Sequence, residues 1–272
     1  MRFTDQTALV TGASTGIGAA FARELAARGA HLILVARSRD KLQTLAEDLQ
    51  ATHGVRVDVL PTDLARPGAV AHLAEQVSQL GRTVDILVNN AGFATHGDVD
   101  AADPGRLHEQ VQLNVTAVLD LTTTFLPAMT ARRRGSIINV ASTAAFQPVP
   151  HMAVYGATKA FVLSFTEALW AETRPTGVRV LAVCPGATET PFFDVVGAEE
   201  ASAGKRRTPE QVVATALHAL DRGVPSVVDG HANALVTRLP RLVPRRTIIA
   251  IAERTVRPRT SATTHEPATT RP

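Results

Sequence analysis

The chain is poor in cysteine and in long apolar stretches. Cys184 is the only cysteine among 272 residues, so no intramolecular disulfide and no all-cysteine metal site can form. We expect no metal, and a reducing compartment. No run of about 18 apolar residues indicates a membrane span, and the amino terminus lacks the apolar core of a signal peptide. The sequence therefore predicts a soluble, cytoplasmic protein.

Tyrosine and lysine are also scarce, yet two of them stand four residues apart. Tyr155 is the only tyrosine, and Lys159 is one of three lysines beside 25 arginines. If residues 154–170 are helical, both side chains point into one space, where an ammonium favours the phenolate form of a phenol. Ser142, at an expected strand end, can hydrogen-bond a carbonyl oxygen. A helix-surface pair is the alternative, but the scarcity of both residue types favours a site that moves protons at an alcohol oxygen.

Length and charge limit the remaining classes. With 272 residues, 45% of them apolar, the simplest organisation is one α/β domain of about 230 to 250 residues plus a tail. The net charge of +3 is uneven, because residues 238–272 hold eight arginines and two glutamates. This basic tail has no interleaved aromatic residues and no recognisable binding module, so we expect no nucleic-acid partner.

Short apolar segments alternate with helical ones along the chain. This alternation predicts a parallel sheet with helices on both faces. The expected strands are residues 7–10, 31–36, 55–60, 84–88, 135–141, 178–183 and 226–228.

Glycine and asparagine stand where strands are expected to end. T-G-A-S-T-G-I-G, residues 11–18, follows the first strand and precedes a helix, a context in which glycines let the backbone approach a pyrophosphate. An ordinary turn is the alternative. N-N-A-G, residues 89–92, follows the fourth strand. Asn114 lies within a long helical stretch, 105–130, and is either a tolerated surface residue or a place where its amide or a bent backbone is used.

Together these segments resemble the short-chain dehydrogenase/reductase family in its ordinary single-domain form. The resemblance covers about residues 5–230 and rests on T-G-A-S-T-G-I-G, N-N-A-G, Asn114, Ser142, Y-G-A-T-K (155–159) and P-G (185–186). It implies a Rossmann-type doubly wound, seven-stranded parallel α/β sheet with helices on both faces. It also implies a nicotinamide cofactor.

The resemblance further implies a catalytic set of Asn114, Ser142, Tyr155 and Lys159. Hydride would pass between nicotinamide and a carbonyl or secondary alcohol, with Tyr155 as the acid in reduction and the base in oxidation. Lys159 would lower the pKa of Tyr155 and hold the nicotinamide ribose. Ser142 would orient the carbonyl oxygen, and Asn114 would anchor a water that leads protons to Lys159.

The resemblance also implies the cofactor site. The glycines would face the pyrophosphate, Asp63 the adenine, and Asn89 with the backbone that follows it the adenosine ribose. The full set of expected cofactor residues is Gly12, Ser14, Thr15, Gly16, Ile17, Gly18, Arg37, Arg39, Asp63, Leu64, Asn89, Ala91, Gly92, Tyr155, Lys159, Pro185, Gly186, Thr188 and Thr190.

The end of the second strand favours NADP(H) over NAD(H). An enzyme that selects NAD places a carboxylate there, whereas this chain has Ala36, followed by Arg37 and Arg39. Guanidinium groups bind a 2′-phosphate through charge-assisted hydrogen bonds. The alternative is that both arginines only begin the next helix. Thr15, where some NADP-binding relatives carry a basic residue, leaves the phosphate site incomplete.

An apolar substrate pocket is expected beside Tyr155. It favours a lipophilic small-molecule carbonyl or alcohol, such as a ketone, a 3-oxoacyl chain or a steroid-like alcohol, over a sugar. The alternative function is that of a cofactor-binding regulator or scaffold without turnover. A second alternative, among enzymes, is a dehydratase or epimerase that uses the same fold. The expected pocket residues are Phe93, Ala144, Phe146, Val149, His151, Phe192 and Phe193.

The family pattern ends near Gly230. We expect a catalytic domain at 1–230, an amphipathic helical extension at 231–257 and a disordered tail at 258–272. In the extension, Leu and Ile alternate with Arg, so it can cover the protein's own surface, a second subunit or an anionic membrane. We favour a homodimer or homotetramer over membrane-surface contact.

Overall fold

A computed structural model of the chain describes residues 2–192, 206–239 and 243–257. Its described residues form a seven-stranded sheet with the order β3-β2-β1-β4-β5-β6-β7, in which all neighbours run parallel. The predicted doubly wound fold is confirmed. Strand order reverses between β1 and β4, so a crevice opens at the carboxyl ends of the strands there. The strands are β1 Thr7–Thr11, β2 His31–Ala36, β3 Val57–Pro61, β4 Ile86–Asn89, β5 Gly135–Val140, β6 Val178–Cys184 and β7 Ser226–Val228.

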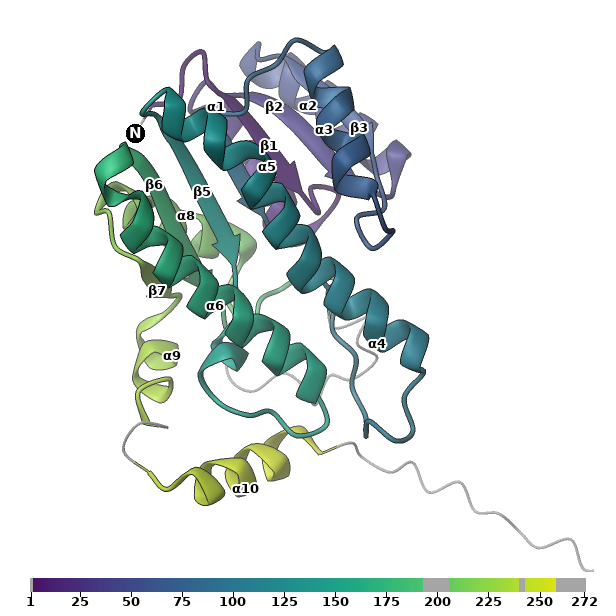
Figure 1. Cartoon of the computed structure of the whole chain (residues 1–272), viewed down its shortest axis with the longest axis vertical. Coiled ribbons are helices and arrows are strands. Elements are labelled where there is room, and N and C mark those ends of the chain that lie inside the picture. Colours follow the sequence, from purple (N-terminus) through teal and green to yellow (C-terminus); the bar gives the residue numbers. More distant parts are fainter. Residues whose placement is uncertain (1, 193–205, 240–242, 258–272) are drawn as a thin grey trace, which may run out of the picture.

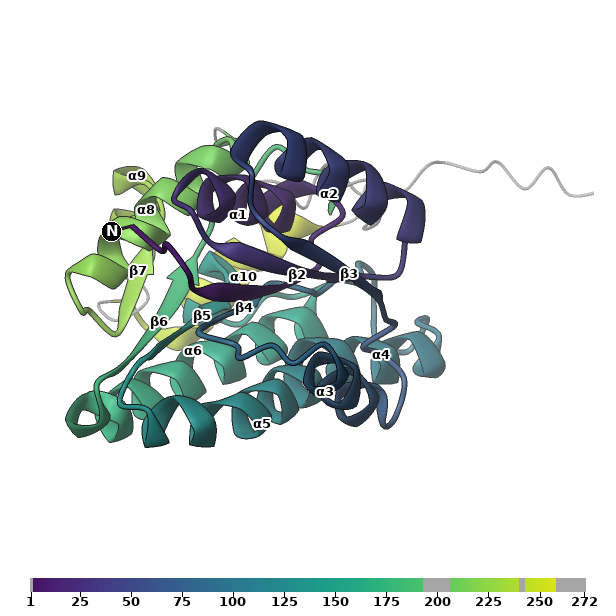
Figure 2. The same ribbon diagram turned by 90° about the horizontal axis from the view of Figure 1, so that it is seen from above.

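Helices cover both faces of the sheet. Figure 2 shows α1, α2 and α8 on one face and α3, α5 and α6 on the other. Successive strand residues therefore enter different cores: Ala8 and Val10 pack with the first layer and Leu9 with the second. The helices are α1 Gly16–Ala27, α2 Arg39–His53, α3 Ala69–Gln79, α4 Pro104–Val111, α5 Ala117–Ala131, α6 Ala153–Thr173, α8 Pro209–Asp221, α9 His231–Val236 and α10 Arg245–Val256, with 3₁₀ turns at Thr143–Phe146 and Arg174–Thr176.

The predicted long helical stretch 105–130 is interrupted. A π-helical turn, Gln112–Thr116, joins α4 to α5 (Figure 1). Such a turn inserts an extra residue into the helix and often marks a functional position. The turn surrounds Asn114, which is buried. Asn114 is therefore not a tolerated surface residue. The other interpretation, in which its amide or a bent backbone is used, is confirmed.

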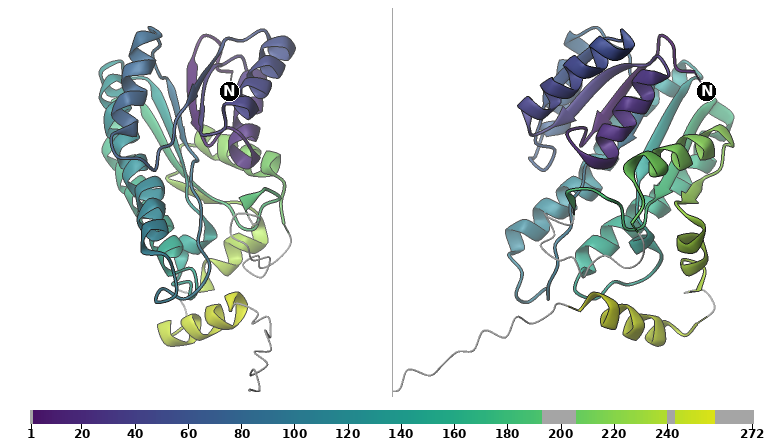
Figure 3. Two further views of the ribbon diagram at one scale, coloured as in Figure 1. Left: turned by 90° about the vertical axis from the view of Figure 1, so that its right-hand side faces the viewer. Right: turned by 180° about the vertical axis from the view of Figure 1, so that it is seen from behind.

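The last two helices lie beyond the carboxyl ends of the strands (Figures 1 and 3). On α10, Ile248, Ala252 and Val256 are buried at a spacing of four residues, whereas Ile251 is 57% exposed. The inner face of α10 thus packs on the protein's own surface, one of the three roles weighed for this extension. Among the described residues, no helix is both long and apolar enough to cross a membrane. The predicted tail at 258–272 lies outside the described residues.

Candidate active site

A cavity of about 1060 Å³ opens at the carboxyl ends of the strands. It brings together side chains from the glycine-rich turn, from the segments after β2, β3, β4, β5 and β6, and from α6. Of the predicted catalytic set, Ser142, Tyr155 and Lys159 line it. The predicted cofactor residues that line it are Gly12, Ser14, Thr15, Gly16, Ile17, Arg37, Asp63, Leu64, Ala91, Gly92, Tyr155, Lys159, Pro185, Gly186, Thr188 and Thr190, and the predicted pocket residues are Phe93, Ala144, Phe146, Val149 and Phe192.

Tyr155 and Lys159 come from the first two turns of α6. Both are buried, with 8% and 6% exposure, and the Lys159 Nζ lies 5.9 Å from the centre of the Tyr155 ring. The same Nζ donates a 2.8 Å hydrogen bond to the Val140 carbonyl at the end of β5. Ser142 follows directly, and its Oγ accepts a hydrogen bond from the Ala144 amide at 3.1 Å. The helix and the strand end together bring all three functional groups into one cavity.

Burial dominates the protonation of this pair. It raises the pKa of Tyr155 to about 12, and a hydrogen bond with the Ser142 hydroxyl acts in the opposite direction. Burial also lowers the pKa of Lys159 to about 8. In the chain alone, loss of hydration disfavours the phenolate and decides the direction of this shift, and the expectation that Lys159 lowers the pKa of Tyr155 stays a prediction. At neutral pH the phenol is therefore protonated, the form that can donate a proton to a carbonyl oxygen.

Asn114 lies behind the cavity wall and does not line it. Its Oδ1 accepts from the Phe93 amide at 3.1 Å, and its Nδ2 donates to the Phe93 carbonyl at 2.9 Å and to the Thr158 Oγ1 at 3.1 Å. The amide therefore ties the segment after β4 to α6. Its expected role in anchoring a water stays a prediction.

The glycine-rich turn has a backbone that suits a close ligand. Gly12 and Gly16 have φ of +65° and +55°, which side-chain-bearing residues rarely adopt. A Cβ on Gly16 would lie 2.8 Å from the Thr190 Cγ2, across the cavity. Gly18 does not line the cavity, and its predicted cofactor contact stays a prediction. A Cβ there would lie 2.2 Å from the Gly12 carbonyl oxygen, so the packing of the turn itself requires this glycine.

The Asn89 side chain points away from the cavity. It ends β4 buried, and its Nδ2 donates to the Asn139 Oδ1 at 2.8 Å. Side chains alternate along a strand, so the next one, Asn90, lines the cavity, and the predicted contact of Asn89 and the following backbone with the cofactor stays a prediction. The Asn90 Nδ2 donates to the Thr11 carbonyl at 2.9 Å. Counting this alternation along the apolar run before Asn89 could have indicated that Asn90 faces the cavity.

Two guanidinium groups reach the cavity near the ends of β2 and β3. Arg37 lines it, whereas Arg39 lies on α2 and does not line it, so the predicted contact of Arg39 with the cofactor stays a prediction. The second guanidinium is that of Arg66, which the sequence analysis missed. Arg66 pairs with Asp63 at 3.4 Å from Nε to Oδ2. In the sequence, only its position three residues after Asp63 could have indicated that Arg66 lies near the cavity.

Phe93, Phe146 and Phe192 line the cavity together with aliphatic side chains and with the charged Arg106 and Glu109. His151 does not line it: this residue has φ of +59°, and its Nδ1 bonds the Asp98 carboxylate at 2.7 Å. The backbone conformation turns the ring toward the neighbouring loop. Phe193 lies outside the described residues. Lining residues that the sequence analysis missed are Met152, Val236, Val256 and Arg106, whose guanidinium carbon lies 3.8 Å from the centre of the Phe93 ring.

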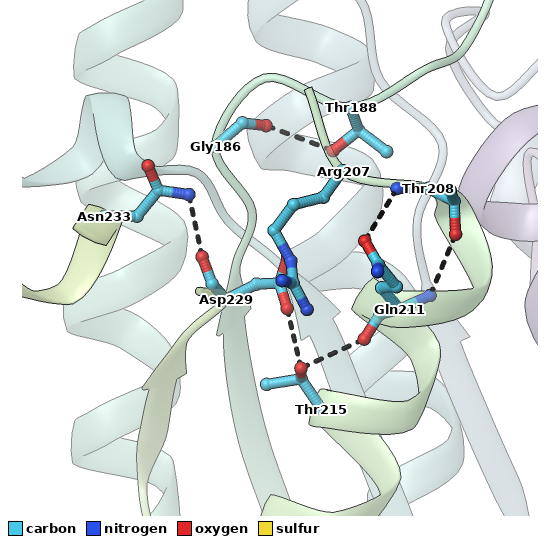
Figure 4. Close-up of polar contacts among 8 residues, drawn as sticks. All are labelled: Gly186, Thr188, Arg207, Thr208, Gln211, Thr215, Asp229 and Asn233. Carbon is cyan, nitrogen blue, oxygen red and sulfur yellow. Dashed lines mark hydrogen bonds and ion pairs between the residues drawn. The ribbon is translucent and has the colours of Figure 1, made fainter. Parts of the chain in front are cut away.

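A buried ion pair holds the wall after β6. Figure 4 shows the Arg207 side chain reaching Asp229, with Thr215 on the other carboxylate oxygen. The distances are 2.6 Å for both contacts, and the Asp229 side chain is 1% exposed. The Arg207 amide donates to the Ala187 carbonyl at 3.0 Å, which ties the ion pair to the segment that carries Gly186 and Thr188. The network thus fixes cavity-lining backbone from the segment after β6.

Known proteins resemble the chain throughout this region. A family profile described as short chain dehydrogenase matches residues 6–201. Granaticin polyketide synthase putative ketoacyl reductase 1 of Streptomyces violaceoruber is 44% identical over 193 residues, 70% of each chain. 17-beta-hydroxysteroid dehydrogenase type 3 of Mus musculus is 36% identical over 197 residues, which are 71% of this chain but only 63% of that protein. A solved short-chain dehydrogenase from Sphingobium yanoikuyae in complex with NADPH has a TM-score of 0.80 at 34% identity, and the match covers 89% of this chain and 94% of that one.

Proposed function

Because the chain belongs to the short-chain dehydrogenase family, we propose that it is an oxidoreductase that transfers hydride between NADP(H) and a lipophilic carbonyl or secondary alcohol. One observation carries the proposal: Ser142, Tyr155 and Lys159 meet in a cavity that the glycine-rich turn also lines. A scaffold without turnover has no need of a buried ammonium and a buried phenol in the same cavity, since both cost stability.

The residues present fit a nicotinamide dinucleotide. The positive φ of Gly12 and Gly16 leaves the backbone of the turn free of side chains, and the turn opens α1, where amides attract a pyrophosphate. When bound, the nicotinamide supplies or accepts the hydride. Lys159 is the side chain best placed to hold the ribose next to Tyr155.

In the reducing direction the chain's own groups supply the proton. The protonated Tyr155 hydroxyl donates to the carbonyl oxygen, and the Ser142 hydroxyl donates a second hydrogen bond that orients the same oxygen. The nearby Lys159 ammonium stabilises the phenolate that results. In oxidation the same phenolate takes the proton from the alcohol. Asn114 acts by holding the segment after β4 against α6.

We propose a preference for NADPH on the basis of the two guanidinium groups beside Asp63. Arg37 and Arg66 line the cavity, and Ala36 at the end of β2 offers no carboxylate to repel a 2′-phosphate. In this proposal Arg66, and not Arg39, is the second arginine that binds the 2′-phosphate beside Arg37. The NADPH in the solved Sphingobium structure agrees with this preference.

We propose a lipophilic substrate because aromatic and aliphatic side chains supply much of the cavity lining. Phe93, Phe146 and Phe192 face it together with aliphatic side chains. The printed names of the relatives, a hydroxysteroid dehydrogenase and a putative ketoacyl reductase, fit ring-shaped and chain-shaped substrates of this kind. A homo-oligomer stays our proposal for the assembly, supported by Leu235, Val236 and Leu239, which are exposed on and after α9.

Oxidation of NADPH and NADH, followed by absorbance with a panel of apolar ketones, tests the function. We expect kcat/KM to favour NADPH. Tyr155→Phe should lower kcat by about 10²–10⁴-fold while NADPH still binds. Arg37→Ala should reduce the NADPH preference, whereas Arg39→Ala, outside the cavity, serves as its matched control. Near-normal turnover by Tyr155→Phe would contradict the mechanism, and an equal response of both arginine variants would contradict the cofactor assignment.

A further inference from the structure

The helix α10 crosses the apolar end of the cavity. Figure 1 shows it beneath the first turns of α6, at the side of the molecule where the strands end. Its Ile248 faces a groove formed by the segment from Ala145 to Pro150 and the start of α6. Ala252 and Val256, which follow Ile248 along the helix at intervals of four residues, are also buried. The helix is therefore a part of the cavity wall that comes from the end of the chain.

Val256 is the residue by which α10 reaches the reaction site. It lines the cavity and packs in one apolar cluster with Ala94, Met152 and Tyr155. The Val256 side chain and its neighbours Ala94 and Met152 are apolar, so they offer a ligand dispersion contacts and exclusion of water. This surface favours an apolar part of a substrate.

A hydrogen bond fixes the carboxyl end of α10. The His96 Nε2 lies 2.7 Å from the Val256 carbonyl oxygen, and because a carbonyl only accepts, Nε2 is the donor. His96 belongs to the segment after β4 that also carries Phe93. A second link, from the His151 Nδ1 to Asp98 at 2.7 Å, joins this segment to the one before α6. Three segments far apart in the sequence thus hold Val256 in place.

We infer that α10 forms an apolar subsite of the substrate cavity next to Tyr155, in which Val256 determines specificity for the alkyl chain or ring attached to the reacting carbon. The inference deepens the proposed function and rests on it. The family profile ends at residue 201, so Val256 lies outside the region in which the chain resembles its relatives most. Residues of the shared region carry the chemistry, whereas α10 limits the length of substrate that fits.

The test compares a short ketone, 2-butanone, with a long one, 2-decanone. Val256→Trp fills the subsite and should lower kcat/KM for 2-decanone about tenfold relative to 2-butanone, because a few methylene contacts carry that much discrimination. Val256→Ala enlarges it and should shift the ratio toward the long ketone. Ile251→Ala, on the exposed face of the same helix, should leave the ratio and the KM for NADPH unchanged. Equal effects of Val256→Trp on both ketones would overturn the inference.

A second pair of variants tests how α10 is held. His96→Gln keeps an amide donor for the Val256 carbonyl and should retain the selectivity, whereas His96→Phe removes the donor and should weaken it severalfold. Equal selectivity in the two variants would refute the role of the hydrogen bond.

Titration calorimetry of 2-decanone into the protein with NADP⁺ measures the affinity of the subsite for the ketone without turnover. Weaker binding to Val256→Trp than to wild type supports the subsite even if neither ketone is reduced, in which case the proposed function fails alone. Unchanged binding to Val256→Trp and Val256→Ala overturns the subsite.

Discussion

Replacement of Lys159 by Met should make the protein more stable while it removes turnover. Lys159 lines the cavity but is only 6% exposed, and its ammonium meets the Val140 carbonyl. Burial lowers its pKa from 10.5 to about 8, so the folded protein binds this proton less tightly than the unfolded chain does. Such a residue costs folding free energy at neutral pH, and a methionine of similar length avoids that cost.

The size of the effect follows from the pKa change. Each pKa unit corresponds to 1.36 kcal/mol, so the drop to about 8 corresponds to about 3 kcal/mol at pH 7. The variant leaves the Val140 carbonyl without its donor, which costs about 1 kcal/mol. The expected net gain in the free energy of unfolding is about 2 kcal/mol, or about 4 to 8 °C in Tm for a protein of this size.

The pH dependence distinguishes this cause from better packing. Between about pH 8 and 10.5 the unfolded chain keeps the lysine proton and the folded protein releases it, so unfolding takes up a proton. The wild type therefore gains stability relative to Lys159→Met as the pH rises through this window, and above it only the cost of about 1 kcal/mol at the Val140 carbonyl remains, in favour of the wild type. The raised pKa of Tyr155 acts above pH 10 and is common to both proteins.

Urea unfolding at pH 7 and pH 9.5 measures both quantities. Trp170 is the only tryptophan, and its Nε1 donates to the Gly223 carbonyl, so its fluorescence reports on the packed α6. Lys41→Met, exposed on α2, controls for the loss of a positive charge. The reasoning fails if Lys159→Met is less stable than wild type at pH 7, or if the difference between them is the same at both pH values.

Two further substitutions test how the cavity is built. Gly18→Ala should lower stability by about 1–3 kcal/mol and raise the KM for NADPH, because the added Cβ would lie 2.2 Å from the Gly12 carbonyl; an unchanged Tm would contradict this. Arg207→Met should destabilise by about 3–5 kcal/mol, since it leaves the buried Asp229 carboxylate unpaired. The double variant with Asp229→Asn should recover part of that loss in thermal unfolding, and purely additive losses would show that the two side chains are not coupled.

The sequence by itself determined the order of the elements and the chemistry of the site. Runs such as Leu32–Val35 are apolar throughout because both faces of a parallel strand are covered, and this pattern depends only on near neighbours. Tyr155 and Lys159 share one face because a helix repeats after 3.6 residues. These features are local, so the chain reveals them without its fold.

Only the tertiary structure decided which neighbouring residue faces the cavity. The side chain of Asn90 lines the cavity and that of Asn89 does not. Arg66 lines it together with Arg37, whereas His151 does not line it. Each outcome depends on side-chain direction and on backbone conformation at the end of a strand or loop. The sign of the Tyr155 pKa change was likewise decided by burial, which many distant residues produce together.

The contribution of α10 is the clearest case. His96 and Val256 are 160 residues apart, and no local pattern relates them. Their contact exists because the sheet brings the segment after β4 to the same edge as the start of α6, where the inner face of α10 can be buried. Local periodicity determines what a segment becomes, whereas the free energy of burying surfaces from distant segments determines what it touches.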